Sequence, residues 1–414
     1  AVGRQLGWVL GALNEGGNVS EAELREHFSE QFLAQVPLDQ LASVLAALAA
    51  AAPFTLVAIS DVTAEAALEV LVASASGQGI IDISVDPSSG LISGLLFREA
   101  PDLQSGRPAS WDEVDSSVTN LAPRTNYLVA KLDGETCAAV HGARSDDRLA
   151  IGSTFKLYVL AELGRQIEAG MLDWQSTISI QDALKSLPSG QLQDLPAGTQ
   201  LSIQDVATNM ISISDNTAAD HLIDRLGREN VEAEQSRAGH GAPELNIPFL
   251  TTRNLFWFKL NASAADVASY LADDVPTRRN VLDSIAGQPL ATDAAASWTL
   301  PRYIDQLEWF ASATDLCHVM ASLDAAAERD GLSPLHDVLS KNPGLPLDTT
   351  AFPYVAYKGG SEPGVLQLAW LVHHRDGTRY FVSVGTNDTG AAIDETPVLR
   401  TALGIFDLLA NGGE

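Results

Sequence analysis

The chain has 414 residues, of which 46% are hydrophobic and 19% are charged. This length and composition exclude a disordered chain and are typical of a globular protein with two, at most three, domains. Acidic residues outnumber basic ones by 53 to 25, for a net charge of −28. Because nucleic acids and anionic membrane surfaces are bound by basic surfaces, neither is an expected partner, and we expect a soluble protein.

The first hundred residues predict helices followed by strands. Ser20 and Glu23 form a capping-box pattern at a helix start, and Pro37 suits the first turn of a helix that runs to about Ala52. The long apolar stretch here is broken by Pro53, so we expect a buried helix and a strand rather than a membrane span. Short strands are expected at 54–60, 67–75, 79–86 and 90–99. This order predicts an α+β domain over residues 1–100.

A connector containing Pro, Ser and Asp, residues 101–125, predicts a linker with a short helix near 111–121. A second domain, 126–414, follows. Its predicted strands fall at both ends, at 127–132, 136–143, 355–360, 364–374 and 380–387, with a mainly helical region between them and a last helix near 397–410. This order predicts one antiparallel sheet with strands from both ends of the domain.

Ser153 precedes Lys156 by three positions at a predicted helix start, and the chain has only six lysines. Residues i and i+3 share a helix face, so the lysine amine can reach the serine hydroxyl. A serine nucleophile needs such a base, and N–H groups at a helix start can stabilise an oxyanion. The pair is also compatible with a surface charge on an amphipathic helix.

Two further motifs follow along the chain. Residues 214–216 read Ser-Asp-Asn, and Lys358 precedes two glycines at the end of an apolar strand. Separately, the first could be a helix N-cap and the second a solvated strand end. In this order, S-x-x-K, S-D-N and K-x-G resemble the motif set of class A β-lactamases and penicillin-binding proteins, over about residues 111–414.

This resemblance implies a serine hydrolase that forms an acyl-enzyme and needs no cofactor or metal ion. Ser153 would be the nucleophile, Lys156 its base, and Ser214 the group that passes the proton to the leaving atom. The substrate-binding residues implied are Asn216, Lys358, Gly360 and Ser361, with the oxyanion between the N–H groups of Ser153 and Ser361. The partner expected is a small-molecule substrate: a β-lactam, an ester or a D-Ala-D-Ala-like peptide.

The resemblance also implies a fold and a location. The second domain would be β-lactamase-like, an antiparallel sheet flanked by a helical subdomain. The first would be cystatin-like or steroid-isomerase-like (NTF2-like), as in a similar two-domain β-lactamase-like protein of clavulanic acid biosynthesis. Such enzymes usually work outside the cytoplasmic membrane, so we expect a secreted or cell-envelope protein, with a cytoplasmic location as the alternative. No oligomeric state is predicted.

The chain departs from the family pattern at two positions. Class A β-lactamases deacylate with the glutamate of an E-x-x-L-N loop, and here Ala242 occupies that place, although Asn246 matches. Glu244, two positions further on, is the remaining candidate base. Gly359 stands where the family usually has Thr or Ser, with Ser361 as a candidate replacement. A long insertion precedes the last motif. We expect its aromatic residues 256–258 in the core, with the insertion as a lid over the cleft as the alternative.

Three functions therefore compete. The first is a β-lactamase of modest rate, the second an esterase or D-Ala-D-Ala-type peptidase, and the third a binding module that keeps β-lactams as a long-lived acyl-enzyme.

Cys137 and Cys317 are too few for a disulfide framework; each is expected as a small buried hydrophobe, with a single bridge as the alternative. The eight histidines show no ligand spacing, so no metal site is expected.

Overall fold

A computed structural model of the protein describes residues 1–61, 67–187 and 189–412. The chain divides into two compact units, Ala1–Asp102 and Leu103–Glu414. The segment predicted as a linker therefore belongs largely to the second unit. Its predicted helix, α5 (Trp111–Leu121), buries Val114 and Val118 in that unit's core.

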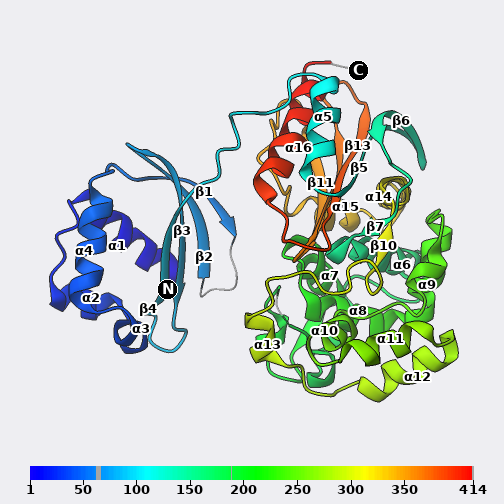
Figure 1. The fold of residues 1–414 in the computed structure, drawn as a ribbon, viewed down its shortest axis with the longest axis horizontal. Coiled ribbons are helices and arrows are strands. Elements are labelled where there is room, and N and C mark those ends of the chain that lie inside the picture. Colours follow the sequence, from blue (N-terminus) through cyan, green and yellow to red (C-terminus); the bar gives the residue numbers. More distant parts are fainter. Residues whose placement is uncertain (62–66, 188, 413–414) are drawn as a thin grey trace. The chain divides into compact units, whose positions relative to one another are not determined.

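The first unit combines four helices with a four-stranded antiparallel sheet in the order β1-β2-β3-β4 (Figure 1). Its capping box at Ser20 and Glu23 is present, as predicted, whereas the first helix was not expected from the sequence. The cystatin-like or steroid-isomerase-like identity stays a prediction. The elements are α1 (Val2–Asn14), α2 (Glu21–His27), α3 (Glu30–Gln35), α4 (Leu38–Ala49), β1 (Thr55–Asp61), β2 (Ala67–Ser74), β3 (Gly77–Val85) and β4 (Ile92–Glu99).

The second unit is built on a five-stranded antiparallel sheet in the order β11-β12-β13-β5-β6. Strands from both ends of the unit are thus neighbours, as the sequence predicted. The strands are β5 (Arg124–Asp133), β6 (Thr136–Ala143), β11 (Tyr354–Glu362), β12 (Val365–His373) and β13 (Arg379–Asn387). Helices α5 and α16 (Glu395–Ala410) cover one face, and α6 (Lys156–Glu168), α14 (Ala313–Ala327) and α15 (Pro334–Ser340) the other (Figure 1).

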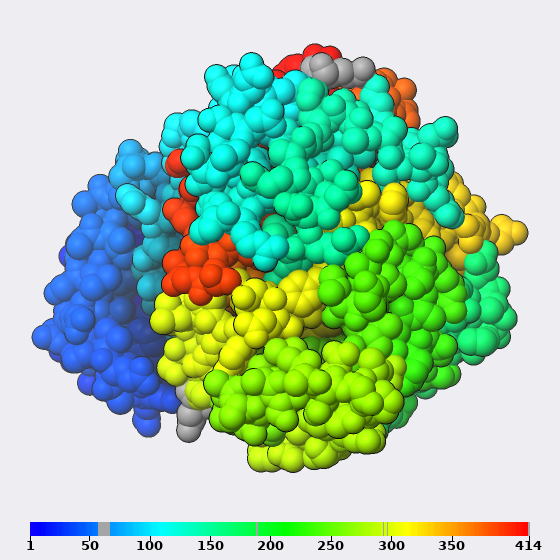
Figure 2. Space-filling view, turned by 45° about the vertical axis from the view of Figure 1, so that its right-hand side comes forward, coloured from blue at the N-terminus to red at the C-terminus, as the bar shows by residue number. Residues whose placement is uncertain are grey.

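A helical region continues from the second face of the sheet. Its first part holds α7 (Ile203–Ser212), α8 (Asn216–Leu226) and α9 (Arg228–Arg237). The predicted insertion forms α10 (Thr252–Leu260), α11 (Ala264–Ala272), α12 (Val275–Ile285) and α13 (Thr292–Ala296), whose surface lies beside the green surface of the preceding helices (Figure 2). Two short ribbons complete it: β7 (Leu149–Ala150) with β10 (Phe310–Ala311), and β8 (Thr177–Ser179) with β9 (Gln200–Ser202).

Cys137 on β6 and Cys317 on α14 form a disulfide across 180 positions of sequence. The expectation of two separate buried thiols is therefore wrong, and the alternative of a single bridge holds. Pairing was hard to foresee because only the tertiary packing of α14 on the sheet brings the two residues together. Across the described ranges, every helix is too short or too polar to traverse a bilayer.

Candidate active site

Ser153 lies in a short 3-10 turn, η1 (Gly152–Phe155), directly before α6 begins at Lys156. The preceding ribbon β7 pairs with β10, which fixes where the turn starts. Lys156 is completely buried, and its Nζ lies 3.1 Å from Ser153 Oγ. The spacing of three positions has therefore brought the amine to the hydroxyl.

The S-D-N motif meets the same amine from the start of α8. Asp215 caps this helix by accepting a hydrogen bond from the N–H of Ala218. Ser214, just before the cap, has a φ of +55°, an uncommon conformation for a residue with a side chain. This backbone turn directs its carbonyl and its hydroxyl toward Lys156 Nζ, at 2.5 and 3.1 Å, while Asn216 Oδ1 lies at 2.7 Å.

Lys358 on β11 reaches the site from the opposite side. Its Nζ donates to Ser214 Oγ at 2.9 Å and to the carbonyl of Gly359 at 2.5 Å. The Ser214 hydroxyl thus lies between two lysine amines. A proton can move along this row of groups, from Ser153 through Lys156 to Ser214, over hydrogen bonds of about normal length.

Both lysines are buried, and burial disfavours their charged forms. Burial lowers the pKa of Lys156 to about 7, although the negative charges of Asp215 and Asp220 act to raise it. Burial also lowers the pKa of Lys358 well below its usual value, and the positive charge of Lys156 lowers it further. Near neutral pH, Lys156 is therefore available as an uncharged amine that can accept a proton.

The main chains of η1 and β11 touch at Gly360. A Cβ at this position would lie 2.1 Å from the Ile151 carbonyl oxygen and 2.6 Å from Ser153 N, so only glycine fits. A Cβ on Gly152 would in turn lie 3.2 Å from Ser361 N. The two predicted oxyanion donors, the N–H groups of Ser153 and Ser361, therefore come from segments in direct contact.

A cleft of about 240 Å³ opens over Ser153. Its walls carry Asn216 and Ser361 from the motifs and an aromatic set that the sequence did not assign to the site. Phe256, expected in the core, lines this cleft together with Trp298, whereas Phe258 is buried as expected. The complete lining is Gly152, Ser153, Phe155, Ser189, Asn216, Thr252, Leu255, Phe256, Trp298, Trp309, Ser361, Glu362 and Pro363.

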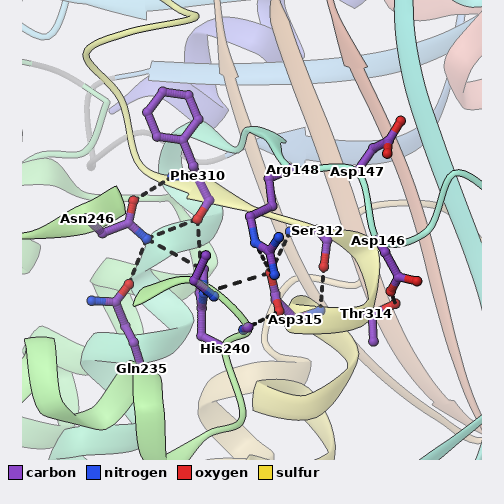
Figure 3. Close-up of polar contacts among 12 residues, drawn as sticks. Asp146, Asp147, Arg148, Gln235, His240, Asn246, Phe310, Ser312, Thr314 and Asp315 are labelled. Carbon is purple, nitrogen blue, oxygen red and sulfur yellow. Dashed lines mark hydrogen bonds and ion pairs between the residues drawn. The ribbon is translucent and has the colours of Figure 1, made fainter. Parts of the chain in front are cut away.

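The segment 240–246, which carries the departures at Ala242 and Glu244, is fastened to β10 (Figure 3). Asn246 donates to the Phe310 carbonyl at 2.9 Å and accepts from the Phe310 N–H at 2.8 Å. His240 Nε2 also bonds the Phe310 carbonyl, at 2.8 Å. Glu244, on η4 (Pro243–Asn246), is exposed and is not among the described residues that line the cleft. Its catalytic role stays a prediction.

One acidic residue of the cleft was missed by sequence reasoning. Glu362, directly after Ser361, forms an ion pair with the buried Lys259 of α10. Lys259 also pairs with Glu308, at 2.5 Å. The only sequence signal was a glutamate adjoining the third motif, because its two partners are remote in the chain.

A histidine cluster lies at the other end of the sheet. Asp324 Oδ1 is 2.9 Å from Nε2 of both His336 and His373, and these three residues could offer ligand atoms to a metal ion. Arg379 donates to the other oxygen of Asp324 at 2.6 Å. Since this guanidinium already neutralises the carboxylate, the cluster is satisfied as an ion-pair network. Spacing could not reveal it, because three separate elements contribute.

Comparisons with known proteins bear on the fold of the second unit. The chain is similar in fold to the β-lactamases of Sphaerobacter thermophilus (20% identity, TM-score 0.51) and Chitinophaga pinensis (16%, 0.51), each match covering 73% of this chain and 98% of the other. A mutant of the class A β-lactamase of the last common ancestor of Gram-negative bacteria matches at 13% identity and a TM-score of 0.51, covering 73% of this chain and all of that one. A search of curated proteins found no match.

Two family models match successive parts of the chain. The model described as ORF 12 gene product N-terminal matches residues 1–92. The model described as the beta-lactamase enzyme family matches residues 119–402, which is more than half of the chain and includes all three motifs. The chain therefore belongs to the β-lactamase enzyme family.

Proposed function

We propose that the second unit is a penicillin-recognising serine hydrolase that opens β-lactam amides through an acyl-enzyme on Ser153. The observation that carries the proposal is the unbroken row Ser153 Oγ, Lys156 Nζ, Ser214 Oγ and Lys358 Nζ, with successive distances of 3.1, 3.1 and 2.9 Å. A nucleophile, a base and a proton-delivering hydroxyl are what amide opening by serine requires.

In acylation, uncharged Lys156 takes the Ser153 hydroxyl proton as Oγ attacks the β-lactam carbonyl carbon. The negative charge that develops on the carbonyl oxygen is stabilised by the N–H groups of Ser153 and Ser361. The C–N bond then breaks, and the leaving nitrogen takes a proton from the Ser214 hydroxyl, which Lys156 replenishes. Asn216 holds Lys156 in place and offers its amide to the substrate.

Lys358 is the proposed partner of the substrate carboxylate. In the free protein its pKa is well below the usual value, because of burial and the nearby charge of Lys156. An anion within about 4–6 Å favours the charged form of an amine. A bound carboxylate would therefore restore the Lys358 ammonium, and substrates without a carboxylate would lose this ion pair.

The alternatives share the same nucleophile. An esterase or a D-Ala-D-Ala-type peptidase would use the same row of groups on a different carbonyl. A β-lactam-binding module that deacylates slowly is favoured by two observations: Ala242 stands at the family's glutamate position, and Glu244 is exposed. The lifetime of the acyl-enzyme separates this module from a β-lactamase.

The disulfide between Cys137 and Cys317 supports a location outside the cytoplasm, since disulfides form and persist in oxidising compartments. This agrees with a role in the cell envelope or in secretion. Localisation of the tagged protein by cell fractionation would test it, and a purely cytoplasmic protein with two free thiols would contradict it.

The function is tested by time-resolved intact-mass measurement with a penicillin and with a chromogenic cephalosporin, using Ser153→Ala as control. We expect a covalent adduct or turnover in the wild type and neither in the variant. Adducts on both proteins would place the nucleophile elsewhere. If neither β-lactam reacts, the β-lactam assignment fails, and esters and D-Ala-D-Ala peptides are the next substrates to assay.

A further inference from the structure

Three ionisable side chains meet at one end of the cleft: Lys259, Glu308 and Glu362. The lysine and Glu308 are fully buried, and Glu362 keeps 8% of its side chain exposed. Lys259 Nζ donates to both carboxylates, at 2.5 Å for Glu308. Because Glu362 alone of the three lines the cleft, it connects this buried cluster to the space above Ser153.

The cluster has one carboxylate more than its single lysine can neutralise. Glu308 is the better satisfied as an anion, because its second oxygen also accepts the N–H of Trp309 at 3.1 Å. Arg302, the further cation nearby, donates instead to the main-chain carbonyl of Lys259, at 2.7 Å. Burial, the charge of Glu308 and a hydrogen bond with it raise the pKa of Glu362 well above its usual value. Glu362 is therefore the group that gains and loses a proton.

The course of β11 brings this carboxyl near the nucleophile. Alternate residues of a strand point to one face, so Lys358, Gly360 and Glu362 share the face that meets η1. Gly360 is in contact with the main chain of Ser153. Glu362 follows two positions later, ~7 Å along the strand at 3.3–3.4 Å per residue. A glutamate side chain together with one water molecule can span such a distance.

We propose that Glu362 is the acid–base residue of deacylation, accepting a proton from the water that releases the acyl group from Ser153. This inference rests on the proposed function, since it requires an acyl-enzyme. It supplies the base that is missing at Ala242. Glu244 is a less suitable source, because it is exposed and is not among the described residues that line the cleft, while Asn246 and His240 hold its segment on β10 (Figure 3).

The reaction balances without any further reactant. The water oxygen bonds to the acyl carbon while its proton passes to the Glu362 carboxylate, giving a tetrahedral intermediate. This intermediate collapses with cleavage of the bond between the carbon and Ser153 Oγ, and Oγ takes the proton back from Glu362. The products are a carboxylic acid, free serine and the original carboxylate. A carboxylate with a raised pKa is a stronger base than an ordinary one.

The test measures acylation and deacylation separately with benzylpenicillin between pH 5 and 9, by rapid quench and intact mass. Glu362→Gln keeps the size of the side chain and removes its proton exchange. We expect acylation to stay within ~3-fold of wild type and deacylation to slow ~100-fold or more, the usual contribution of a general base. The rise of the deacylation rate with pH should also disappear.

Glu308→Gln is the matched variant, because it removes the other carboxylate partner of Lys259. With one negative charge fewer beside Glu362, the rising limb of the deacylation profile should persist and move to lower pH. If the cluster served only to hold α10 against β11, both variants would lower thermal stability alike. They would change neither the pH dependence of the deacylation rate nor the ratio of the acylation and deacylation rates. That result would overturn the proposal.

If Glu362→Gln folds poorly, Glu362→Asp takes its place in the test. The aspartate keeps the carboxylate but shortens the side chain by one methylene, so deacylation should be slower while its rate still rises with pH. Equal acyl-enzyme lifetimes in wild type and Glu362→Gln would overturn the role of Glu362 and leave the proposed function intact. The same holds if Glu244→Gln, and not Glu362→Gln, traps the adduct. Absence of any adduct on Ser153 would overturn the proposed function and this inference together.

Discussion

Two regions meet at Ser153 and differ in how they are built. On one side, Lys156, Ser214 and Lys358 come from three short motifs, and each amine lies within 3.1 Å of a serine hydroxyl. On the other side, the glutamate position of the family holds Ala242, and the acidic group of the cleft, Glu362, pairs with Lys259 of the insertion, which also pairs with Glu308. The first region follows the family pattern, and the second departs from it.

The difference follows from what each step demands. Acylation needs a row of donors and acceptors at hydrogen-bond distance, which leaves little freedom in residue type or position. Deacylation needs one base that positions a water molecule, and several points on a cleft wall can supply it. We call Lys156, Ser214 and Lys358 the lysine side of the site, and Glu362, its partners and the segment 240–246 the acidic side. We therefore expect variants on the lysine side to abolish the adduct, and variants on the acidic side to change its lifetime. The following predictions test that division.

The largest effect is expected at Lys156. Lys156→Met keeps the length of the buried side chain and removes the base, so acylation should slow ~10²–10⁴-fold. In the proposed mechanism the uncharged amine is the active form, and burial lowers its pKa to about 7. The acylation rate should therefore rise with pH through about 7 and level off above it, as measured by stopped flow with a chromogenic cephalosporin.

Lys156→Arg is the companion variant, since a guanidinium does not lose its proton in proteins. It should be as slow as Lys156→Met even though it restores the charge. A Lys156→Met variant that acylated at the wild-type rate would show that the base lies elsewhere. Acylation would then not depend on Lys156.

The next largest effect concerns stability. Replacing both Cys137 and Cys317 by serine should lower the free energy of unfolding by ~2–5 kcal/mol, as for other native disulfides. The bridge holds α14, whose Asp315 accepts the N–H of Gly241 at 2.8 Å and so supports the segment 240–246. Denaturant unfolding measures the loss, and an unchanged acylation rate constant is the expected control. A stability equal to that of the wild type would contradict a native disulfide.

Asn246→Ala tests whether the segment 240–246 takes part in deacylation or only supports the cleft. The side chain is buried, and its loss leaves the Phe310 N–H without its partner, while the Phe310 carbonyl keeps its hydrogen bond with His240. An unpaired buried N–H should cost ~1–3 kcal/mol of stability. If the segment only supports the cleft, the lifetime of the acyl-enzyme should stay within a few-fold of wild type. A lifetime increased by more than tenfold in intact-mass measurements would instead make Asn246 part of the deacylation step.

Much of the fold was predictable because its strands and helices carry strong local signals. The four strands of the first unit, α5, and the assembly of the second sheet from both ends of its unit are confirmed. The S-x-x-K spacing likewise placed Lys156 beside Ser153, since helical geometry is local. The pairing of Glu362 with Lys259 and Glu308, the disulfide and the place of Phe256 depend on contacts between remote segments. No periodicity or short motif records such contacts.

The smallest effect is expected at Ser361, and it bears on the other departure from the family pattern. A Cβ at Gly359 would lie 2.2 Å from the Tyr357 hydroxyl, so the Tyr357 side chain occupies the space that the threonine usual in the family would need. Ser361 is exposed, lines the cleft and lies on the same strand as Lys358, so its hydroxyl is the candidate to bond a substrate carboxylate. Ser361→Ala should raise KM for carboxylate-bearing β-lactams ~10-fold, the loss of one hydrogen bond to a charged group, with little change in kcat. Steady-state kinetics with a matched substrate ester provides the control, because the ester offers no carboxylate and its KM should not respond. If KM rises equally for both substrates, the Ser361 side chain contributes to binding of the oxyanion and not of the carboxylate. The residues needed for acylation would then include the end of β11.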